Sequence, residues 1–358
     1  MTASPNAAML DEIRGQPARL AQALPALRDR VRGLGLSRMQ PPAAVYLTGC
    51  GDASWLPQAA RMAFERRLDV AVHALPAMEV SQYAPLRAGD LVVLMSISGE
   101  TQRTLEAMES ARAAGARTLA LTARSGAPLA SGCDHTLLLP GEAESQNAPH
   151  CLNYTMTLLA LYTLAEGLAA GRMHGLDAVP EAMGATFAQA LGPSQVAASA
   201  TGGSDQTWFF GAGPHWGTAQ YAAALWWSAG GMPALALELE DIAHGAHHVL
   251  RPGDLAVLVA PPGRSQARAR ELLAGLVELG TYPVLIGGLS DERGVFSLPV
   301  AAVGEDEALG ALTTAVAMQL LCWASACERG HDVLTRVGGA PDRIHRRWRN
   351  ETTRYPRG

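Results

Sequence analysis

Residues 91–104 read Leu91-Val-Val-Leu-Met-Ser96-Ile-Ser-Gly-Glu-Thr101-Gln-Arg-Thr104, and the predicted fold is built outward from them. The first five residues are apolar and rich in valine, which is typical of a strand buried on both faces. The polar segment that follows surrounds Gly99, and a helix is predicted over residues 101–114. A buried strand that turns directly into a helix is the unit from which parallel α/β sheets are built.

The same alternation extends to both sides of this stretch. Short apolar runs at 44–48, 70–72, 118–121 and 135–138 are predicted strands, a helix is predicted over 55–67, and a long helix over 151–169 closes the unit. Strands that alternate with helices predict a parallel sheet covered by helices on both faces, which is an α/β fold.

The order of elements then repeats, with predicted strands at 207–210, 255–259 and 283–286 and helices between and after them. The repeat indicates two copies of one α/β unit. We place a helical segment at 1–34, interrupted near Pro17 and Pro25, the first unit at 35–175, the second at 200–335, and a C-terminal tail at 336–358. A linker is expected near 174–204, in which a helix over 180–191 is an alternative.

The composition excludes several classes of function. Only 17% of the 358 residues are charged and the formal net charge is −5, so no basic face for a nucleic acid is expected. All 28 basic residues are arginine, which excludes Schiff-base chemistry by lysine. The five cysteines form no C-x-x-C pair and indicate reduced thiols, so a cytoplasmic location is expected. We expect neither a signal peptide nor a membrane span.

The polar segment after the strand at 91–95 is the candidate ligand site. Ser96, Ser98, Thr101 and Thr104 offer hydroxyl groups, and Gly99 allows a tight backbone turn. Ligands of parallel sheets bind beyond the carboxyl ends of the strands, and the first turn of a helix favours an anion. The segment therefore predicts a site for a phosphate monoester held by hydrogen bonds. The alternative is a helix N-cap made by Ser98 or Thr101 alone.

Two nucleotide-binding patterns are not met. A Walker-type loop requires a lysine, which this chain lacks. The dinucleotide pattern G-x-G-x-x-G begins at Gly49 and Gly51, but Ser54 stands at the third glycine. A nucleotide-binding or redox protein is therefore the disfavoured alternative.

The second unit does not preserve the candidate phosphate loop. Its matching segment reads Ala260-Pro-Pro-Gly-Arg-Ser265. The two prolines remove N–H donors, and two hydroxyl groups are lost. We expect one phosphate site per chain, in the first unit. A different anion at Arg264 is an alternative to an ordinary surface arginine.

Three stretches of the chain resemble the SIS (sugar isomerase) domain family: Ser96-Ile-Ser-Gly-Glu-Thr101, Gly49-Cys-Gly-Asp52 and Met9-Leu-Asp-Glu-Ile-Arg-Gly-Gln-Pro17. The doubled arrangement is similar to the isomerase half of glucosamine-6-phosphate synthase and to related phosphosugar isomerases, deaminases and deglycases. The resemblance implies two flavodoxin-like subdomains and a phosphorylated hexose or aminohexose as the ligand. It also implies phosphate contacts from Gly51 and Asp52, no metal or organic cofactor, and a homodimer whose site is completed across the interface.

Nothing in the sequence resembles the glutaminase half of the synthase, so we do not expect synthesis of glucosamine from glutamine. The resemblance instead implies acid–base chemistry by Glu238-Leu-Glu-Asp-Ile-Ala-His244-Gly-Ala-His-His248. Asp241 and His244 match the family's acid followed by His-Gly, so His244 is the candidate for opening the sugar ring in the partner subunit's site. A solvated histidine is the alternative, and a metal site of Asp241, His244 and His248 is disfavoured because no strong zinc spacing is present.

Two positions depart from the family pattern. The family's catalytic glutamate falls at Ser228, which cannot act as a base, and the family's C-terminal lysine is missing. Glu240 or Glu144 is a candidate replacement for the base. Glu144, Asn147 and His345 are also candidate sugar contacts, with an ordinary basic tail as the alternative for His345.

The sequence thus predicts a phosphosugar enzyme that uses acid–base chemistry, either an aldose–ketose isomerase or an aminosugar-phosphate deaminase or deglycase. The alternative is a non-catalytic phosphosugar sensor that has lost the glutamate and the lysine. The absence of a recognisable effector segment counts against a sensor.

Overall fold

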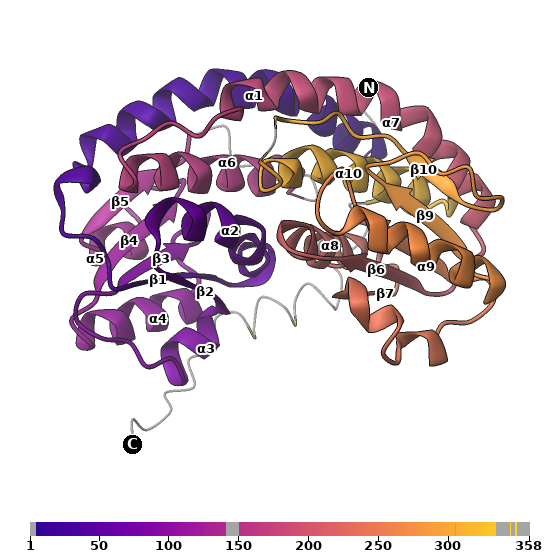
Figure 1. The fold of residues 1–358 in the computed structure, drawn as a ribbon. Coiled ribbons are helices and arrows are strands. Elements are labelled where there is room, and N and C mark those ends of the chain that lie inside the picture. Colours follow the sequence, from indigo (N-terminus) through magenta and orange to yellow (C-terminus); the bar gives the residue numbers. More distant parts are fainter. Residues whose placement is uncertain (1–4, 141–149, 305, 334–343, 345–347, 349–358) are drawn as a thin grey trace.

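The computed structural model describes residues 5–140, 150–304, 306–333, 344 and 348. It contains two parallel five-stranded sheets, which lie on opposite sides of the molecule beneath a layer of long helices (Figure 1). The first sheet has the strand order β2-β1-β3-β4-β5. Its strands are β1 (Ala44–Gly49), β2 (Ala71–Pro76), β3 (Leu91–Met95), β4 (Arg117–Thr122) and β5 (His135–Leu138).

The second sheet repeats this topology, with the strand order β10-β9-β8-β6-β7. Each sheet therefore has its first strand next to the centre and its second strand at an edge, which is the flavodoxin-like order. The predicted α/β fold with two flavodoxin-like units is confirmed. The strands are β6 (Thr207–Gly211), β7 (Ala234–Glu238), β8 (Leu255–Val259), β9 (Tyr282–Ile286) and β10 (Phe296–Leu298).

Two strands of the second sheet were not predicted from the sequence. These strands, β7 and β10, lie at the two edges of the sheet, where only one neighbour pairs with each. Strand β7 is only partly buried and β10 has three residues. Edge strands of this kind lack the continuous apolar run that identifies a central strand.

Helices cover both faces of each sheet because alternate strand residues point to opposite sides. On one face of the first sheet, Tyr46, Val92 and Leu94 form a core with the helices α3 and α4. On the other face, Val45 and Val93 join the helices α1, α2 and α6. The shorter helices are α2 (Leu56–Leu68), α3 (Ala77–Gln82), α4 (Gln102–Ala113), α5 (Pro128–Gly132), α8 (Pro214–Leu225) and α9 (Gln266–Glu278).

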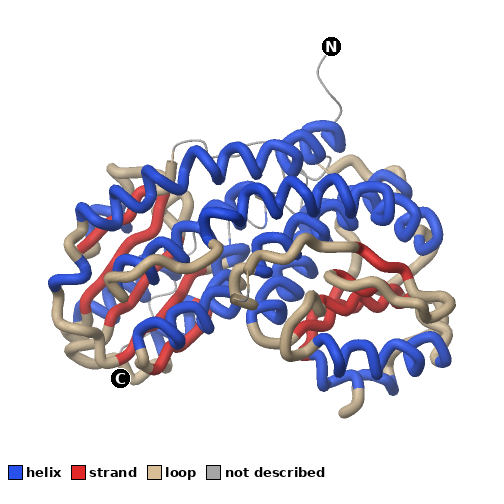
Figure 2. The backbone as a smooth tube through the Cα atoms, turned by 45° about the horizontal axis from the view of Figure 1, so that its top comes forward, coloured by secondary structure: helices blue, strands red, loops and turns tan. Residues whose placement is uncertain are grey.

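Four long helices form a layer over the two sheets and join the two units, with α6 over the first sheet and α10 over the second (Figure 1 and Figure 2). A single hydrophobic core contains residues from both sheets and from all four of these helices. The two units therefore do not have separate interiors. The helices are α1 (Pro5–Gly33), α6 (Cys151–Leu168), α7 (Val179–Thr201) and α10 (Gly310–Glu328).

The interruption expected in the N-terminal segment is absent, because α1 continues through Pro17 and Pro25. Proline at position 17 leaves the carbonyl of Ile13 without its usual helical donor. The side-chain amide of Gln16 donates to that carbonyl at 3.4 Å instead. The carbonyl that Pro25 leaves unpaired belongs to Ala21, on the exposed face of the helix, where water can replace the lost donor.

The expected linker near 174–204 contains a 23-residue helix, α7, which is longer than the alternative over 180–191. It packs against α10 and so belongs to the layer that joins the two units. Among the described residues, α10 is the one helix long and apolar enough to cross a membrane. However, 83% of its apolar 18-residue segment is buried inside the fold. A core helix has these properties, and α10 lies in the core.

A buried polar network fixes the beginning of α6. Gln16 of α1 donates to the side chain of Gln319 on α10 at 2.6 Å and accepts from Thr155 of α6 at 2.5 Å. Gln319 also donates to the carbonyl of Cys151 at 3.2 Å. The carboxylate of Glu12 accepts the N–H of Leu152 at 2.8 Å, so a residue of α1 caps α6.

Candidate functional site

The loop between β3 and α4 is organised by its own hydroxyl groups. The Oγ of Ser96 lies 2.9 Å from the Oγ1 of Thr101 and accepts the N–H of Gly99 at 3.1 Å. The Oγ of Ser98 accepts the N–H of Glu100 at 3.3 Å. Helix α4 begins directly after Thr101. The loop thus presents hydroxyl groups around the positive end of a helix dipole, an arrangement that favours an anion.

Gly99 is required by the geometry of this loop. Its φ of 66° lies in the left-handed region that other residues rarely adopt. A Cβ atom at this position would lie 2.4 Å from the Cβ of Ala127 and 3.0 Å from the Oγ1 of Thr122. The loop therefore packs against the segment that follows β4, and a side chain at Gly99 would displace it.

Thr104 links this loop to the one that follows β1. Its side chain is fully buried, and its hydroxyl donates to the Sγ of Cys50 at 3.6 Å. Burial raises the pKa of the Cys50 thiol. The hydroxyl of Thr104 thus faces the interior, and its predicted contact with phosphate stays a prediction.

Gly51 and Asp52 leave the end of β1 beside the phosphate loop, because Gly49 pairs with Met95 at the ends of β1 and β3. Gly51 has a φ of 57° and is exposed. Burial raises the pKa of Asp52, and the nearby imidazole of His150 partly offsets that rise. Asp52 therefore lies at the same edge of the first sheet as the loop of Ser96, and His150 lies within electrostatic range of its carboxylate.

The matching loop of the second unit is already occupied by a side chain of the protein. The N–H of Arg264 donates to the Oε1 of Glu307 at 3.3 Å. A Cβ at Gly263 would lie 2.6 Å from the same oxygen. The carboxylate of Glu307 thus takes a backbone donor of this loop, which supports the prediction of one phosphate site per chain.

The predicted acid–base residues lie in the second unit, between β7 and β8. The Nε2 of His244 is 3.4 Å from the Oε1 of Glu240, and the His244 side chain is 72% exposed. Both oxygens of Glu240 accept from Arg268, at 2.8 and 2.9 Å, and this hydrogen bonding lowers the pKa of Glu240. Asp241 accepts the N–H of Glu238 at 3.1 Å in a capping box. Glu240 and Asp241 thus both have structural partners, and their roles in catalysis stay predictions.

Ser228 lies in a single π-helical turn, Trp226–Gly230, at the end of α8. It is exposed, and its hydroxyl donates to the carbonyl of Leu225 at 3.3 Å. The predicted sugar contacts Glu144, Asn147 and His345 lie outside the described residues. Within the described ranges, no group of three or more His, Cys, Asp or Glu residues is placed to hold a metal ion.

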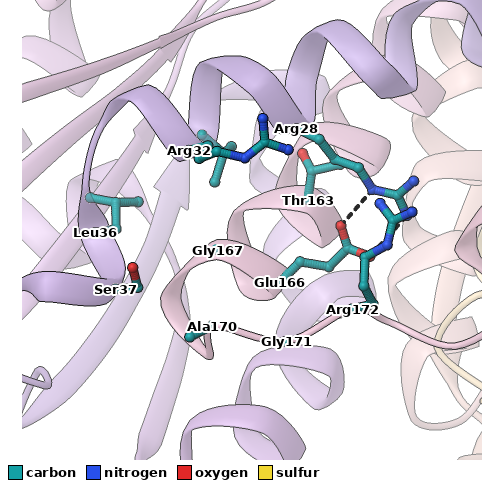
Figure 3. Close-up of a pocket in the computed structure, with 11 residues that line it drawn as sticks. Arg28, Arg32, Leu36, Ser37, Thr163, Glu166, Gly167, Ala170, Gly171 and Arg172 are labelled. Carbon is teal, nitrogen blue, oxygen red and sulfur yellow. Dashed lines mark hydrogen bonds and ion pairs between the residues drawn. The ribbon is translucent and has the colours of Figure 1, made fainter.

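A polar pocket of about 340 Å³ lies elsewhere, between the C-terminal ends of α1 and α6 (Figure 3). Arg28 donates there to Glu166 at 2.8 and 3.0 Å, and it also donates to Asp177. The Oε1 of Glu166 also accepts the N–H of Met173 at 2.8 Å. Each oxygen of this carboxylate has a donor, so the buried ion pair has a structural explanation without a ligand.

Reasoning from sequence missed two residues of the candidate sites. His150 was not named as a candidate, although it immediately precedes the long helix predicted over 151–169. Glu307 gave no signal, because its contact with Arg264 joins residues that are 43 positions apart. Long-range pairing of this kind is not encoded in a local pattern.

Comparison with known proteins identifies the first unit. Residues 40–167 match the family described as the SIS domain. The chain is 29% identical to glutamine–fructose-6-phosphate aminotransferase [isomerizing] of Symbiobacterium thermophilum, over 91% of this chain and 57% of that protein. The chain spans about half the length of the curated relatives it matches.

Solved structures have the same fold over nearly the whole chain. The C-terminal domain of glucosamine-fructose-6-phosphate aminotransferase from Francisella tularensis superposes with a TM-score of 0.80 at 17% identity, covering 91% of this chain and 98% of that one. The tagatose-6-phosphate ketose/aldose isomerase of Escherichia coli gives 0.76 at 16% identity, covering 95% and 96%. The family match, the parallel sheet and the hydroxyl-lined loop after β3 agree that residues 40–167 form a SIS domain, and the whole chain has the same two-sheet fold as these solved structures.

Proposed function

We propose that this protein is an enzyme that binds a phosphorylated hexose or aminohexose and acts on it by acid–base chemistry. The reaction class is aldose–ketose isomerisation or aminosugar-phosphate deamination or deglycation. The printed names of similar proteins include an isomerising aminotransferase, a ketose/aldose isomerase and a fructoselysine 6-phosphate deglycase. Each of these names includes a 6-phosphate.

The observation that carries the proposal is the loop from Ser96 to Thr101. Its hydroxyl groups and the first turn of α4 form an uncharged anion site at the carboxyl end of a parallel sheet. A phosphate monoester fits such a site because several neutral donors can share its charge. The second unit lacks an equivalent loop, so the site belongs to the first unit.

We further propose that a homodimer completes the site. His244 is exposed and belongs to the second unit, whereas the phosphate loop belongs to the first. A second copy of the chain would bring its own His244 to that loop, where the imidazole would open the sugar ring. Sedimentation of the protein should then give a dimer.

Turnover tests this function directly. Fructose 6-phosphate, tagatose 6-phosphate and glucosamine 6-phosphate are incubated with the protein, and the products are followed by NMR. We expect conversion of at least one of these compounds and a loss of about 100-fold or more in His244→Ala, since ring opening depends on that imidazole. Conversion at the wild-type rate in His244→Ala would remove the proposed role of this residue.

The second candidate function is a non-catalytic phosphosugar sensor. The serine at position 228, which stands where the family resemblance places a catalytic glutamate, is the observation that favours it. Calorimetric binding of the three sugar phosphates without any conversion would support the sensor and contradict the enzyme.

A further inference from the structure

The carboxylate of Asp52 lies at the candidate site, and no structural role accounts for it. It lies in the 3₁₀ turn Gly51–Ser54 after β1, and it is only partly exposed. No described residue donates a hydrogen bond to its carboxylate, in contrast to the carboxylates of Glu240 and Glu166. Burial raises the pKa of Asp52, which makes its carboxylate a stronger base than that of a solvated aspartate.

The groups that face Asp52 come from two helices. His150 and Cys151 at the start of α6 interact electrostatically with this carboxylate, and so does Tyr221 of α8. The carboxylate therefore lies within electrostatic range of the first turn of α6 and of α8. Of these three groups, His150 alone is exposed, while Cys151 and Tyr221 are buried. An exposed imidazole thus lies within electrostatic range of a partly buried carboxylate.

The imidazole of His150 is held in a defined orientation. Its backbone has a φ of 59°, and its Nδ1 lies 3.1 Å from the Nδ2 of Asn153. With that amide as the donor, Nδ1 is the acceptor and the proton of the neutral ring is on Nε2. Asn153 is itself 7% exposed, and its Oδ1 has no hydrogen-bond partner among the described residues.

Asp52 lies at the edge of the sheet that carries the phosphate loop. Strands β1 and β3 are neighbours and end level with each other at Gly49 and Met95, so Asp52 and Ser96 leave the same edge of the sheet. The hydrogen bond from Thr104 to Cys50 ties the two loops together. The cap from Glu12 to the N–H of Leu152 fixes the start of α6, where His150 lies.

We propose that Asp52 carries the proton between the two carbons of the bound sugar phosphate, with His150 as its electrophilic partner. This proposal rests on the proposed function, gives that site the base that Ser228 cannot supply, and replaces the phosphate contact that the family resemblance implies for Asp52. Of the two carboxylates predicted from the sequence for this role, Glu240 is held by Arg268, and Glu144 lies outside the described residues.

The proton transfer conserves atoms and electrons. In the open-chain sugar, Asp52 removes the hydrogen on the carbon next to the carbonyl, and the electron pair of that C–H bond forms the C=C bond of an enediolate. Negative charge develops on the carbonyl oxygen, to which the Nε2–H of His150 donates a hydrogen bond. The proton of the neighbouring hydroxyl moves to this oxygen, a carbonyl forms in place of that hydroxyl, and Asp52 returns its proton to the former carbonyl carbon.

Hydrogen exchange with solvent measures this step without requiring net conversion. Fructose 6-phosphate and glucosamine 6-phosphate are incubated in D₂O with wild-type protein, Asp52→Asn and His150→Gln, and loss of the hydrogen next to the carbonyl is followed by NMR. Asp69→Asn is the matched control, because Asp69 is exposed at the end of α2. Calorimetry measures binding of the same compounds, and thermal unfolding checks that each variant folds.

We expect exchange in the wild type and in Asp69→Asn, and a loss of about 100-fold or more in Asp52→Asn with a Kd within about threefold of the wild-type value. His150→Gln should lose about tenfold or more, and Asp52→Glu should recover part of the activity. If Asp52→Asn fails to fold, His150→Gln and Asp52→Glu decide the outcome: exchange at the wild-type rate in both overturns the proposal.

Two other results overturn the proposal while leaving phosphosugar binding intact. One is binding to the wild type without any exchange, and the other is exchange in a folded Asp52→Asn variant within about threefold of the wild-type rate. The absence of binding of either compound to the wild type is a different result, because it contradicts the proposed function itself.

Discussion

The loops after β3 and β8 occupy the same position in two copies of one fold, but their chemistry is opposite. In the first, Ser96, Ser98 and Thr101 surround a glycine whose space is closed by Ala127. In the second, two prolines replace donors, and Glu307 accepts the N–H of Arg264. One loop therefore presents donors to a ligand, while the other has a donor taken by an internal carboxylate.

This difference shows that the strand order alone does not create a site. Both sheets place a loop at the carboxyl end of the central strand, as the flavodoxin-like topology requires. The side chains of that loop then determine whether an anion can bind. The second copy contributes instead to the shared core and presents His244.

Of the substitutions in these two loops, Gly99→Ala is expected to weaken binding of the sugar phosphate most. The new Cβ would meet Ala127 at 2.4 Å, and the residue would be held at a φ of 66°. We expect a loss of affinity for fructose 6-phosphate of about 100-fold and a lower free energy of unfolding by about 1–3 kcal/mol. Gly126→Ala is the control, since its Cβ meets no atom within 4 Å. Equal affinities of the two variants in calorimetry would contradict the proposed geometry.

Ser96→Ala should have the next largest effect on the phosphate loop. It removes the acceptor for Gly99 and the contact with Thr101. We expect affinity for the same compound to fall by about 10- to 30-fold, which corresponds to the loss of roughly one or two hydrogen bonds. The same change at Ser265, in the loop of the second unit, should leave the calorimetric Kd unchanged. A similar loss in both variants would mean that both loops bind the ligand.

A third comparison concerns Ala53 and His215, which occupy matching positions against Gly49 and Gly211 at the ends of β1 and β6. Burial lowers the pKa of His215 from 6.5 to about 3. Between pH 6.5 and about pH 3, His215 binds a proton in the unfolded chain but not in the folded chain. The free energy of unfolding is therefore highest above pH 6.5 and decreases as the pH falls. The contribution is at most about 1.4 kcal/mol per pH unit.

Urea unfolding at pH 7, 6 and 5 tests this effect. The free energy of unfolding of the wild type should fall more steeply with decreasing pH than that of His215→Met, which has no titrating group at this position. Curves with the same slope for the two proteins would show that folding does not lower the pKa of His215.

The smallest effect is expected for Glu307→Gln. The change neutralises the carboxylate that accepts the N–H of Arg264 but leaves the first unit untouched. We expect the Kd for fructose 6-phosphate to change by less than about threefold, since distant sites behave independently. A larger increase in the calorimetric Kd would show that the second loop affects binding of the ligand.

The sequence predicted those features that depend on local patterns. The buried strand β3, the polar loop after it and the helix α4 were correctly predicted, and so was the repetition of the unit. It failed where a distant contact decides the structure. The helix α1 continues through Pro17 because Gln16 compensates for the missing donor.

In the candidate site, too, the residues of a local pattern were predicted from the sequence and the long-range contacts were not. The hydroxyl groups of Ser96 and Thr101 were identified from their order along the chain. The meeting of Asp52 with His150 was not, because it joins two loops about 100 residues apart that only the folded sheet brings together. The role of Glu307 was missed for the same reason.

The central claim, one phosphosugar site per chain in the loop after β3, is tested most directly by the stoichiometry of binding. Fructose 6-phosphate is titrated by calorimetry into the wild type, Ser98→Ala and Ser265→Ala. We predict one site per chain in the wild type and in Ser265→Ala, and an affinity at least about tenfold lower in Ser98→Ala. Two sites per chain, or unchanged affinity in Ser98→Ala, would contradict the claim.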